Sequence, residues 1–440
     1  MAFKVITNLF FLISRMVTDM RLKDCCTIIA GQSPESKYYN TDGIGLPFFQ
    51  GKADFGELYP TIRVYCSQPT KIAEKDDILL SVRAPVGPTN LAPCQVCIGR
   101  GLTAIRPSSL LNLKYVLFFF RYFEAQLQHK GTGTTFKAIT QDIVKNLEIP
   151  VPPLDEQERI VARIEELFSQ LDSGVETLRK TKQQLAVYRQ AVLKEAFEGR
   201  LSTEWRKEHP ECSPARDYES IAIKGSTYKD TSGDENEIQV AFPDTWIKLR
   251  MGDVFPVEVG ATPSRRVPEY WNGVINWVSS GEVRFNRIFS TDERITEEGL
   301  ENSSTNVQPA GTIMLAMIGE GKTRGQAAIL EIPAAHNQNT AAILASATPC
   351  EPKYIYYFLQ MNYENTRRVG SGNNQKALNK ERVRALRFPF TSFVEQRVIV
   401  EEIESRLSVC DSIEQTVDAA LQQAEAMRQS ILKQAFEGDI

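Results

Sequence analysis

One stretch of the chain has the spacing of a phosphate-binding loop. Ala316-Met-Ile-Gly-Glu-Gly-Lys-Thr323 matches the relaxed pattern A/G-x4-G-K-T and follows an apolar, strand-like run. In a working loop of this kind, backbone amides and the N-terminus of a following helix surround the phosphates. Here Arg324-Gly325 and a second apolar run, Ala327–Leu330, follow instead. We therefore expect no nucleotide hydrolysis at this motif.

Cysteine and histidine are too scattered to predict a metal centre. Of eight cysteines only Cys94 and Cys97 form a C-x-x-C pair, and the chain has three histidines. A zinc site assembled from Cys25, Cys26 and Cys66 is a weaker alternative. We expect reduced thiols in a cytoplasmic protein, with no metal or other cofactor bound by this chain.

The elements that would position any functional residue occur twice. Residues 146–199 and 385–438 align without a gap at an offset of 239, and 22 of 54 positions are identical. Within each copy, apolar residues recur every seven positions, which predicts a long helix that packs against another helix. Proline-containing segments, 149–153 and 388–390, precede both predicted helices and mark the end of a preceding domain. The heptad residues that we expect to serve as spacer or partner-docking positions are Ile164, Leu171, Leu178, Leu185, Val192, Ile403, Val417 and Ile431.

The regions before the two helices resemble each other more faintly. Each has a Leu/Met-x-Asp segment, a Gly-x-Ser/Thr-Pro turn, several short apolar strands, a helix and a loop of small residues. Short strands separated by glycine and proline, with a helix among them, predict an α+β domain. The expected strands are 46–49, 78–82, 101–105, 274–278, 313–317 and 340–344, and the expected helices are 115–120 and 354–358.

Charge is segregated between these parts although the whole chain carries only −4. Residues 1–150 and 246–390 are net basic, at +5 and +3, whereas residues 204–245 and 391–440 are net acidic, at −5 and −6. Basic regions of this size are compatible with a polyanion partner and also with ordinary solvated surface charge.

These motifs together resemble the specificity subunit of type I restriction–modification systems. The likeness is carried by Leu147–Gln157, Arg189–Leu201, Ser202–Arg206 and Gly260–Ser264, together with Trp246 and the second copy of the long helix. It covers about residues 16–440. The departures are Val17 and Lys23 in the first opening, Thr391–Val394 at the second helix start, and the extension 1–15, where a start at Met16 or Met20 is an alternative.

The resemblance implies an α+β protein with two pseudo-repeated target-recognition domains, separated by two long helices that form an antiparallel coiled coil. The implied divisions are an N-terminal extension (1–15), a first recognition domain (16–150), a spacer helix (151–203), a linker (204–245), a second recognition domain (246–390) and a second spacer helix (391–440). In that family each domain reads one half of a bipartite double-stranded DNA site. The helices dock two copies of the modification methyltransferase subunit, and restriction (translocase and nuclease) subunits join them. S-adenosylmethionine, ATP and Mg would then belong to the partners, and this chain would be neither an enzyme nor a membrane protein.

Candidate DNA-binding residues follow from the chemistry of base and phosphate recognition. Arginine favours guanine, asparagine and glutamine favour adenine, and lysine, arginine and small hydroxyl residues anchor phosphates. In the first domain we predict Gln50, Lys52, Arg83, Arg100, Thr132, Thr134 and Lys137. In the second domain we predict Arg265, Arg266, Ser280, Arg284, Asn286, Lys322, Arg324, Asn337, Gln338, Asn373, Asn374 and Lys376.

Two other classes of function stay open on the sequence alone. A DNA methyltransferase would need an Asn/Asp-Pro-Pro-Tyr/Phe motif, and Val151-Pro-Pro-Leu154 lacks its polar residue. A scaffold protein of the same architecture would have the same long helices, but its two domains would recognise no DNA sequence. The sequence does not specify the two DNA half-sites, the gap between them, or which partner subunits accompany the chain.

Overall fold

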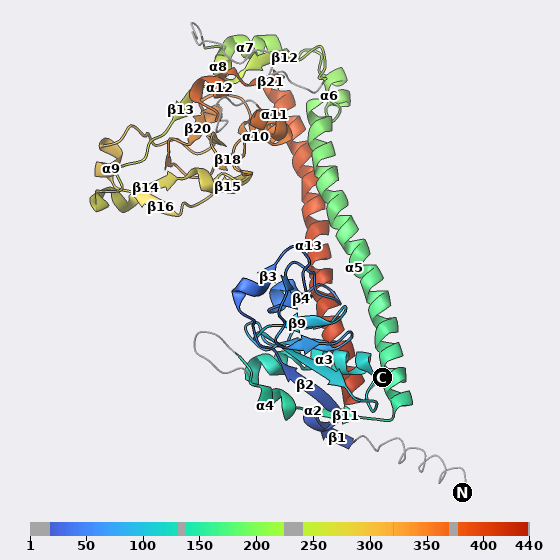
Figure 1. The fold of residues 1–440 in the computed structure, drawn as a ribbon. Helices are drawn as coiled ribbons and strands as arrows, with labels where there is room; N and C mark the ends of the chain where they lie inside the picture. The colour runs from blue at the N-terminus through green and yellow to red at the C-terminus, as the bar shows by residue number, and fades with distance from the viewer. Residues whose placement is uncertain (1–17, 131–137, 224–240, 320, 369–376, 439–440) are drawn as a thin grey trace. The chain divides into compact units, whose positions relative to one another are not determined.

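The computed structural model describes residues 18–130, 138–223, 241–319, 321–368 and 377–438. They belong to two compact units, of which unit 1 is residues 1–180 with 417–440 and unit 2 is residues 181–416 (Figure 1). Each unit holds one α+β head and one part of two long helices, α5 (Leu154–Phe197) and α13 (Phe393–Glu437). Within the described residues, no helix is both long and apolar enough to span a bilayer.

The first head (residues 18–151) contains two main sheets and a covering helix. The four-stranded antiparallel sheet has the order β2-β10-β7-β8, with bounds Cys26–Ala30, Leu102–Pro107, Ile78–Ser81 and Thr89–Leu91. The five-stranded sheet has the order β3-β5-β4-β9-β6, with bounds Tyr39–Asn40, Tyr65–Cys66, Leu46–Phe49, Val96–Ile98 and Ile72–Ala73. The smaller elements are β1 (Thr18–Arg21), β11 (Glu148–Val151), α2 (Leu22–Cys25), α3 (Leu113–Lys130) and α4 (Gln141–Lys145).

The second head (residues 247–390) is built in the same way. Its five-stranded sheet has the order β13-β20-β17-β18-β15, with bounds Val257–Val259, Thr340–Ile343, Ile313–Ala316, Ala327–Leu330 and Asn286–Ile288. The three-stranded sheet has the order β16-β14-β19, with bounds Glu293–Ile295, Trp271–Val278 and Ala335–His336. The remaining elements are β12 (Ile247–Arg250), β21 (Arg387–Phe390), α8 (Met251–Val254), α9 (Glu297–Glu301), α10 (Pro352–Met361), α11 (Tyr363–Arg368) and α12 (Lys380–Ala385).

The topology confirms the predicted duplication of the α+β heads. The sheet β2-β10-β7-β8 corresponds to β13-β20-β17-β18 strand for strand, and the terminal pair β1–β11 corresponds to β12–β21. Each head also contains a parallel pair outside these shared strands, β4 with β9 in the first head and β14 with β19 in the second. The second head has a further parallel pair, β15 with β18. In each head the main helix, α3 or α10, supplies large aromatic residues to the core.

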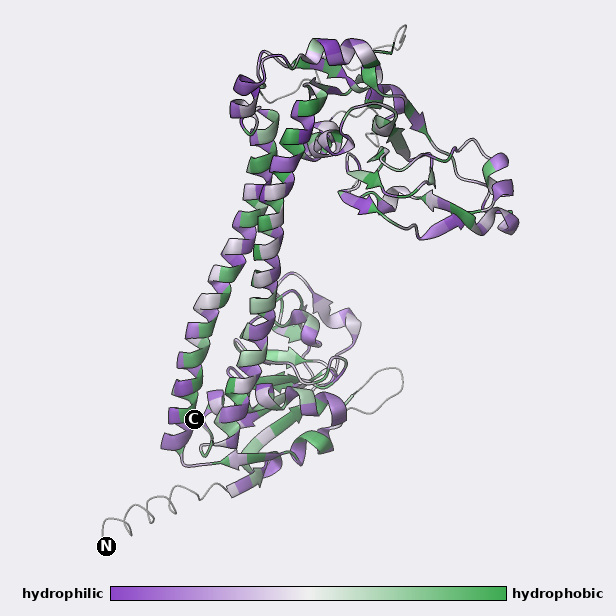
Figure 2. Ribbon diagram, turned by 180° about the vertical axis from the view of Figure 1, so that it is seen from behind, coloured by the Kyte–Doolittle hydropathy of each residue, from purple (hydrophilic) through white to green (hydrophobic). Residues whose placement is uncertain are grey.

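The long helices have the apolar pattern that the heptads predicted (Figure 2). Ile164, Val192, Ile403 and Val417 are buried, and the other predicted heptad residues are half-buried: Leu171, Leu178, Leu185 and Ile431. In unit 1, α5 and α13 are joined by an ion pair of Asp172 with Arg428, and in unit 2 by Arg189 with Asp411 at 2.6 Å. These are the same two positions of the repeat with the helices exchanged. Within unit 2, the ion pairs Arg189–Asp411 and Glu195–Arg406 occur in opposite order on the two helices, which makes them antiparallel there and agrees with the predicted coiled-coil architecture.

The attachment of each head to its long helix also repeats. The Tyr115 hydroxyl donates to the Pro150 carbonyl at 3.0 Å, and its counterpart Tyr354 donates to Pro389 at 2.8 Å. The buried Gln157 amide accepts from the backbone of the α3 start and donates to the Pro152 carbonyl. Its counterpart Gln396 makes the equivalent bonds to the α10 start and to Thr391. The glutamine of the repeated Glu-Gln motif therefore fixes each head helix to the beginning of a long helix.

The glutamate of that motif differs between the two copies. Glu395 is 3% exposed and its carboxylate accepts from Ser202, Arg206 and Trp246 at 2.8, 2.8 and 3.2 Å, and from the Thr391 hydroxyl. Glu156 instead pairs with its own helix neighbour Arg159, and its side chain is 39% exposed. Position 152, which corresponds to Thr391, is a proline and has no hydroxyl. Unit 2 thus has a buried ionic network where unit 1 has a surface pair.

The predicted linker 204–245 is partly helical. Helices α6 (Thr203–Glu208) and α7 (Pro214–Ile221) lie in its first half. The Asp217 carboxylate of α7 accepts the Phe393 backbone N–H at the start of α13, at 2.8 Å. Tyr218 and Ile221 pack against the core of unit 2. This first half of the segment is therefore a folded part of unit 2, which its polar composition did not indicate.

Candidate nucleic-acid interface

In the first head, three loops converge where the parallel strands β4 and β9 end. The Gly99 N–H donates to the Phe49 carbonyl at 2.8 Å, and the Arg100 N–H donates to the Ser33 hydroxyl at 3.2 Å. A Cβ on Gly31 would lie 2.2 Å from the Gly99 carbonyl oxygen, so only glycine fits there. We call residues 31–34, 50–51 and 99–101 the first loop cluster. It presents the exposed side chains of Gln50 and Arg100.

The second head has the same arrangement at the ends of β14 and β19. The Asn337 N–H donates to the Val278 carbonyl at 3.0 Å, and the Ala261 N–H donates to the His336 carbonyl at 3.0 Å. The Thr262 hydroxyl donates to the Gln338 amide oxygen at 2.6 Å. We call residues 260–264, 279–281 and 337–339 the second loop cluster. Ser280 is half-buried at the start of a short 3-10 turn (Ser280–Glu282), and Gln338 is exposed.

Several predicted residues are already engaged within the protein. Arg265 makes a bidentate ion pair with Glu293, which lowers the pKa of that carboxyl, and its guanidinium lies 3.8 Å from the Trp271 ring centre. Asn337 is buried, and its amide oxygen accepts the Asn339 N–H at 3.1 Å. Such residues shape the loops and are less available to a ligand than Arg100 or Gln338.

Other predicted residues lie outside the two clusters. The Arg284 guanidinium donates to the Gly281 carbonyl, and the Arg284 N–H donates to the Asn286 side chain on β15 at 2.9 Å. The Arg324 guanidinium donates to the Arg367 carbonyl at 3.1 Å. Lys52, Arg83, Arg266 and Lys322 are exposed. Thr132, Thr134, Lys137, Asn373, Asn374 and Lys376 lie outside the described residues.

Sequence reasoning missed the two hydroxyl residues of the clusters, Ser33 and Thr262. Both belong to the repeated Gly-x-Ser/Thr-Pro segment, which was interpreted only as a turn. Their structural positions show that the segment packs against the loop carrying Arg100 or Gln338. The recurrence of a hydroxyl before the proline was the signal that could have identified them.

Among the described residues, neither the phosphate-loop-like segment nor a cluster of metal-ligating side chains forms a site for such chemistry. The phosphate-loop-like segment joins β17 to β18, an antiparallel pair, and therefore does not lead into a helix as a phosphate loop does. Within the described ranges, no group of three or more histidine, cysteine or carboxylate side chains could hold a metal ion. The exposed donors and acceptors of the loop clusters suit recognition, because they can bond base edges or phosphates.

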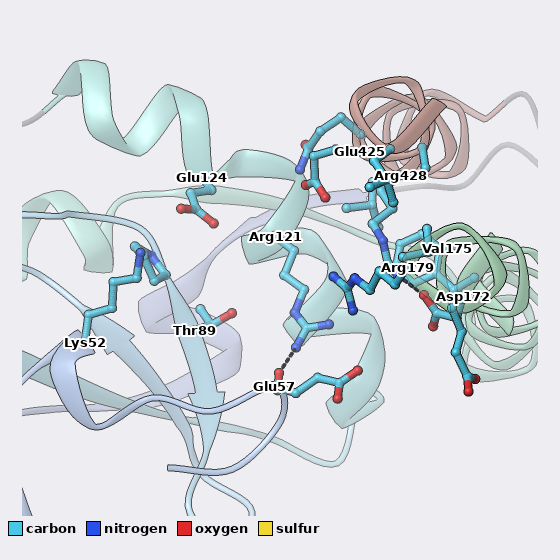
Figure 3. A pocket seen from close by; sticks show the side chains of 17 residues that line it. Lys52, Glu57, Thr89, Arg121, Glu124, Asp172, Val175, Arg179, Glu425 and Arg428 are labelled. Atoms are coloured by element: carbon cyan, nitrogen blue, oxygen red, sulfur yellow. Dashed lines mark hydrogen bonds and ion pairs between the residues drawn. The ribbon is translucent and has the colours of Figure 1, made fainter. Parts of the chain in front are cut away.

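A polar pocket of about 850 Å³ lies between the first head and the long helices of unit 1. Figure 3 shows Arg121, Arg179 and Arg428 reaching into it from α3, α5 and α13. Burial and the nearby Arg428 charge lower the pKa of Arg121, whose guanidinium donates to the Glu57 carbonyl at 3.2 Å. Carboxylates, Asp172 among them, line the same pocket. Because both signs of charge meet there, the pocket is a polar junction between head and helices and does not select a ligand of one sign.

Comparison with known families identifies two copies of one domain. The model of the type I restriction modification DNA specificity domain matches residues 15–185 and 243–423. A putative type I restriction enzyme MjaX specificity subunit from Methanocaldococcus jannaschii is 39% identical over 175 residues, which are 40% of each chain. The EcoBI specificity subunit from Escherichia coli is 25% identical, over 70% of this chain and 62% of its own length. The chain thus aligns with less than two thirds of either of these relatives.

Solved structures agree on the fold. A chain from a study of complex assembly and conformational transition of the type I R-M system superimposes with a TM-score of 0.68 at 16% identity, covering 96% of this chain and 98% of the other. The HsdS subunit from Thermoanaerobacter tengcongensis gives a TM-score of 0.51 at 16% identity, covering 96% and 97%. At this identity the likeness concerns the fold alone.

Proposed function

Because the type I restriction–modification DNA specificity domain accounts for most of this chain in two copies, the chain belongs to that family, and we propose that it is the subunit that selects the DNA sequence in a type I restriction–modification complex. In this proposal each head binds one half of a bipartite double-stranded site. The chain itself catalyses no reaction.

One observation carries the proposal. The two heads share the strand order of four strands of their main sheet, but equivalent places in their loop clusters carry different side chains, Gln50 and Arg100 in one head against Ser279 and Gln338 in the other. Two DNA-binding domains of similar fold that carry different side chains suit a DNA target whose two half-sites differ in sequence. The two heads are also the basic parts of the chain, which favours a polyanion.

The partners follow from the repeated attachment contacts. Two identical modification methyltransferase subunits would dock on the duplicated helices and junctions, and restriction subunits would join through them. S-adenosylmethionine, ATP and Mg would be bound by those subunits. The repeated Tyr115/Tyr354 and Gln157/Gln396 contacts are buried, and they support this because they build both junctions of head and helix on the same framework, as two identical partners require.

Sequencing methylated DNA from a host that expresses the chain with its modification subunits tests the proposal. We expect one bipartite motif with two different halves and a constant gap. Replacing residues 246–390 by the second head of a relative should change one half and leave the other unchanged. Methylation that follows no bipartite motif, or a motif that survives the replacement, would refute the role in sequence selection.

The long helices provide a separate test of the gap. Inserting one heptad into both α5 and α13 adds about 10 Å of helix, which corresponds to about three base pairs of DNA. The gap should lengthen while both half-sites stay the same. An insertion of the same length in the segment 224–240, which is outside both long helices in the sequence, is the control and should leave the motif unaltered. If the gap between the half-sites stays the same after the helix insertion, the long helices do not act as the spacer.

A further inference from the structure

We propose that Arg100 and Gln338 occupy one shared base-reading position, so that the side chain at this place decides one base in each half-site. This inference rests on the proposed role in sequence selection and makes it specific. It concerns the loop that follows the second strand of each parallel pair, β9 in the first head and β19 in the second.

The equivalence of the two positions follows from the strand pairing. In the first head Phe49 pairs with Ile98, and in the second head Val278 pairs with His336, both in parallel register. Arg100 and Gln338 each lie two residues beyond the paired residue. One residue, Gly99 or Asn337, separates the paired residue from Arg100 or Gln338. In both heads its N–H donates to the carbonyl of the last residue of the first strand. The backbone therefore places Arg100 and Gln338 at equivalent positions relative to the parallel strand pair of each head.

A hydroxyl residue supports each position from the same neighbouring loop. The Ser33 hydroxyl accepts the Arg100 backbone N–H at 3.2 Å. The Thr262 hydroxyl donates to the Gln338 side-chain oxygen at 2.6 Å. Ser33 and Thr262 are both the third residue of the repeated Gly-x-Ser/Thr-Pro segment. Ser33 thus fixes the backbone at Arg100, and Thr262 fixes the side chain of Gln338. Groups that are fixed before binding lose less freedom on binding, so this support favours a recognition role.

The two side chains are also accessible. Both are exposed, and among the described residues the Arg100 guanidinium has no hydrogen-bond acceptor or carboxylate partner in the structure. Arg265, by contrast, is held by Glu293, and Asn337 is buried within its loop. Within the described residues of the two loop clusters, the position shared by Arg100 and Gln338 is thus the one at which both heads present a long, exposed polar side chain from equivalent backbone.

The chemistry of the two side chains predicts which bases they select. The arginine guanidinium donates two hydrogen bonds to O6 and N7 of guanine, whereas the glutamine amide donates to N7 and accepts from N6 of adenine. With its oxygen oriented by Thr262, the Gln338 amide keeps its NH₂ group and a second lone pair for such a contact. We therefore expect a guanine in the first half-site and an adenine in the second at the bases under these residues.

The test exchanges the two side chains in the full chain, expressed with its modification subunits, and sequences the methylated sites. R100Q should change or relax one guanine position of the first half-site and leave the second half-site and the gap unchanged. Q338R should do the converse at one adenine position of the second half-site. Arg63→Gln is the matched control, because Arg63 is an exposed arginine of the first head outside the loop cluster. The motif of this control should equal that of the wild type.

A binding measurement covers variants that methylate too weakly to be sequenced. The assembled complex is competed with duplexes that each carry one changed base. The wild type should discriminate by about 5- to 150-fold at one guanine of the first half-site, and R100Q should lose that discrimination at this base alone. An R100Q complex that keeps wild-type discrimination at every base overturns the inference, as does a change confined to the second half-site. A wild type without any preferred sequence overturns the proposed function instead, so the two failures are distinguishable.

Discussion

Replacing Glu395 by glutamine should destabilise unit 2 far more than the same change at Glu156 destabilises unit 1. Glu395 is buried and its carboxylate accepts four hydrogen bonds, one of them from the Arg206 guanidinium at 2.8 Å. The amide of glutamine has one acceptor atom and one donor group, so at least one of the four donors loses its partner. Arg206 also loses its counter-charge.

The size of the effect can be worked from the burial of the two partners. Breaking a fully buried ion pair costs about 3–5 kcal/mol. The Arg206 side chain is 21% exposed and keeps some contact with water, which lowers the expected cost to about 2–3 kcal/mol. For a unit of this size, 1 kcal/mol shifts the melting temperature by about 2–4 °C. The transition of unit 2 should therefore fall by about 4–12 °C.

Glu156→Gln is the matched control, because it changes the corresponding residue of the other repeat. Its surface pair with Arg159 contributes at most about 0.5 kcal/mol, which corresponds to a shift of about 2 °C or less. Differential scanning calorimetry of the full-length variants measures both shifts. Equal shifts for the two variants would show that the buried network of unit 2 adds no stability beyond a surface ion pair, and the reasoning would be wrong.

Three further changes test other contacts. Burial lowers the pKa of His336 to about 4, so the unfolded chain binds the proton more readily, and this residue should remove roughly 3 kcal/mol of stability as pH drops from about 6.5 to 4. Urea midpoints measured against pH should therefore fall more steeply in the wild type than in His336→Gln, and equal slopes would contradict this. Tyr354→Phe leaves the buried Pro389 carbonyl without its donor and should cost about 1–2 kcal/mol in urea unfolding, and a midpoint equal to that of the wild type would contradict this. Arg189→Gln removes the ion pairs with Asp411 and Glu414, whose side chains are 65% and 35% exposed, so its cost should be about 2 kcal/mol or less at low salt. The cost should shrink in about 0.5 M salt, as thermal melts at both concentrations can check.

The parts of the fold that could be predicted are those in which one local pattern repeats many times. Heptads in residues 154–197 and 393–437 predicted both long helices, and Ile164 and Ile403 are fully buried as expected. The Glu-Gln motif marked the beginning of each helix. The structural role of the glutamine in this motif could not be predicted from the sequence, because the partners of Gln157 are backbone groups 5 to 47 residues away.

The candidate site was predictable in residue type but not in place. Arginine, asparagine and glutamine in basic domains indicated recognition, yet Arg265 and Asn337 are held by partners that no local pattern reveals. The pairing of Arg265 with Glu293 depends on the register of β14 with β16, and that register includes an irregularity between Trp271 and Ile275. The grouping of Arg100 with Ser33 likewise depends on a contact over 67 residues. Non-local pairing of this kind is the information that one sequence read alone does not contain.

The glycines of the loop clusters have a consequence for how the protein can change over evolutionary time. At Gly31 and Gly260 a Cβ would lie 2.2 and 1.9 Å from a neighbouring carbonyl oxygen, so the backbone at these points tolerates no other residue. The exposed side chains a few residues away contribute little to stability, and substitutions at such positions usually cost within about 0.5 kcal/mol. The glycines of the loop framework are therefore fixed by sterics, while the outward side chains can be exchanged at little cost in stability. A lineage can then acquire a new specificity by single substitutions without passing through an unfolded intermediate.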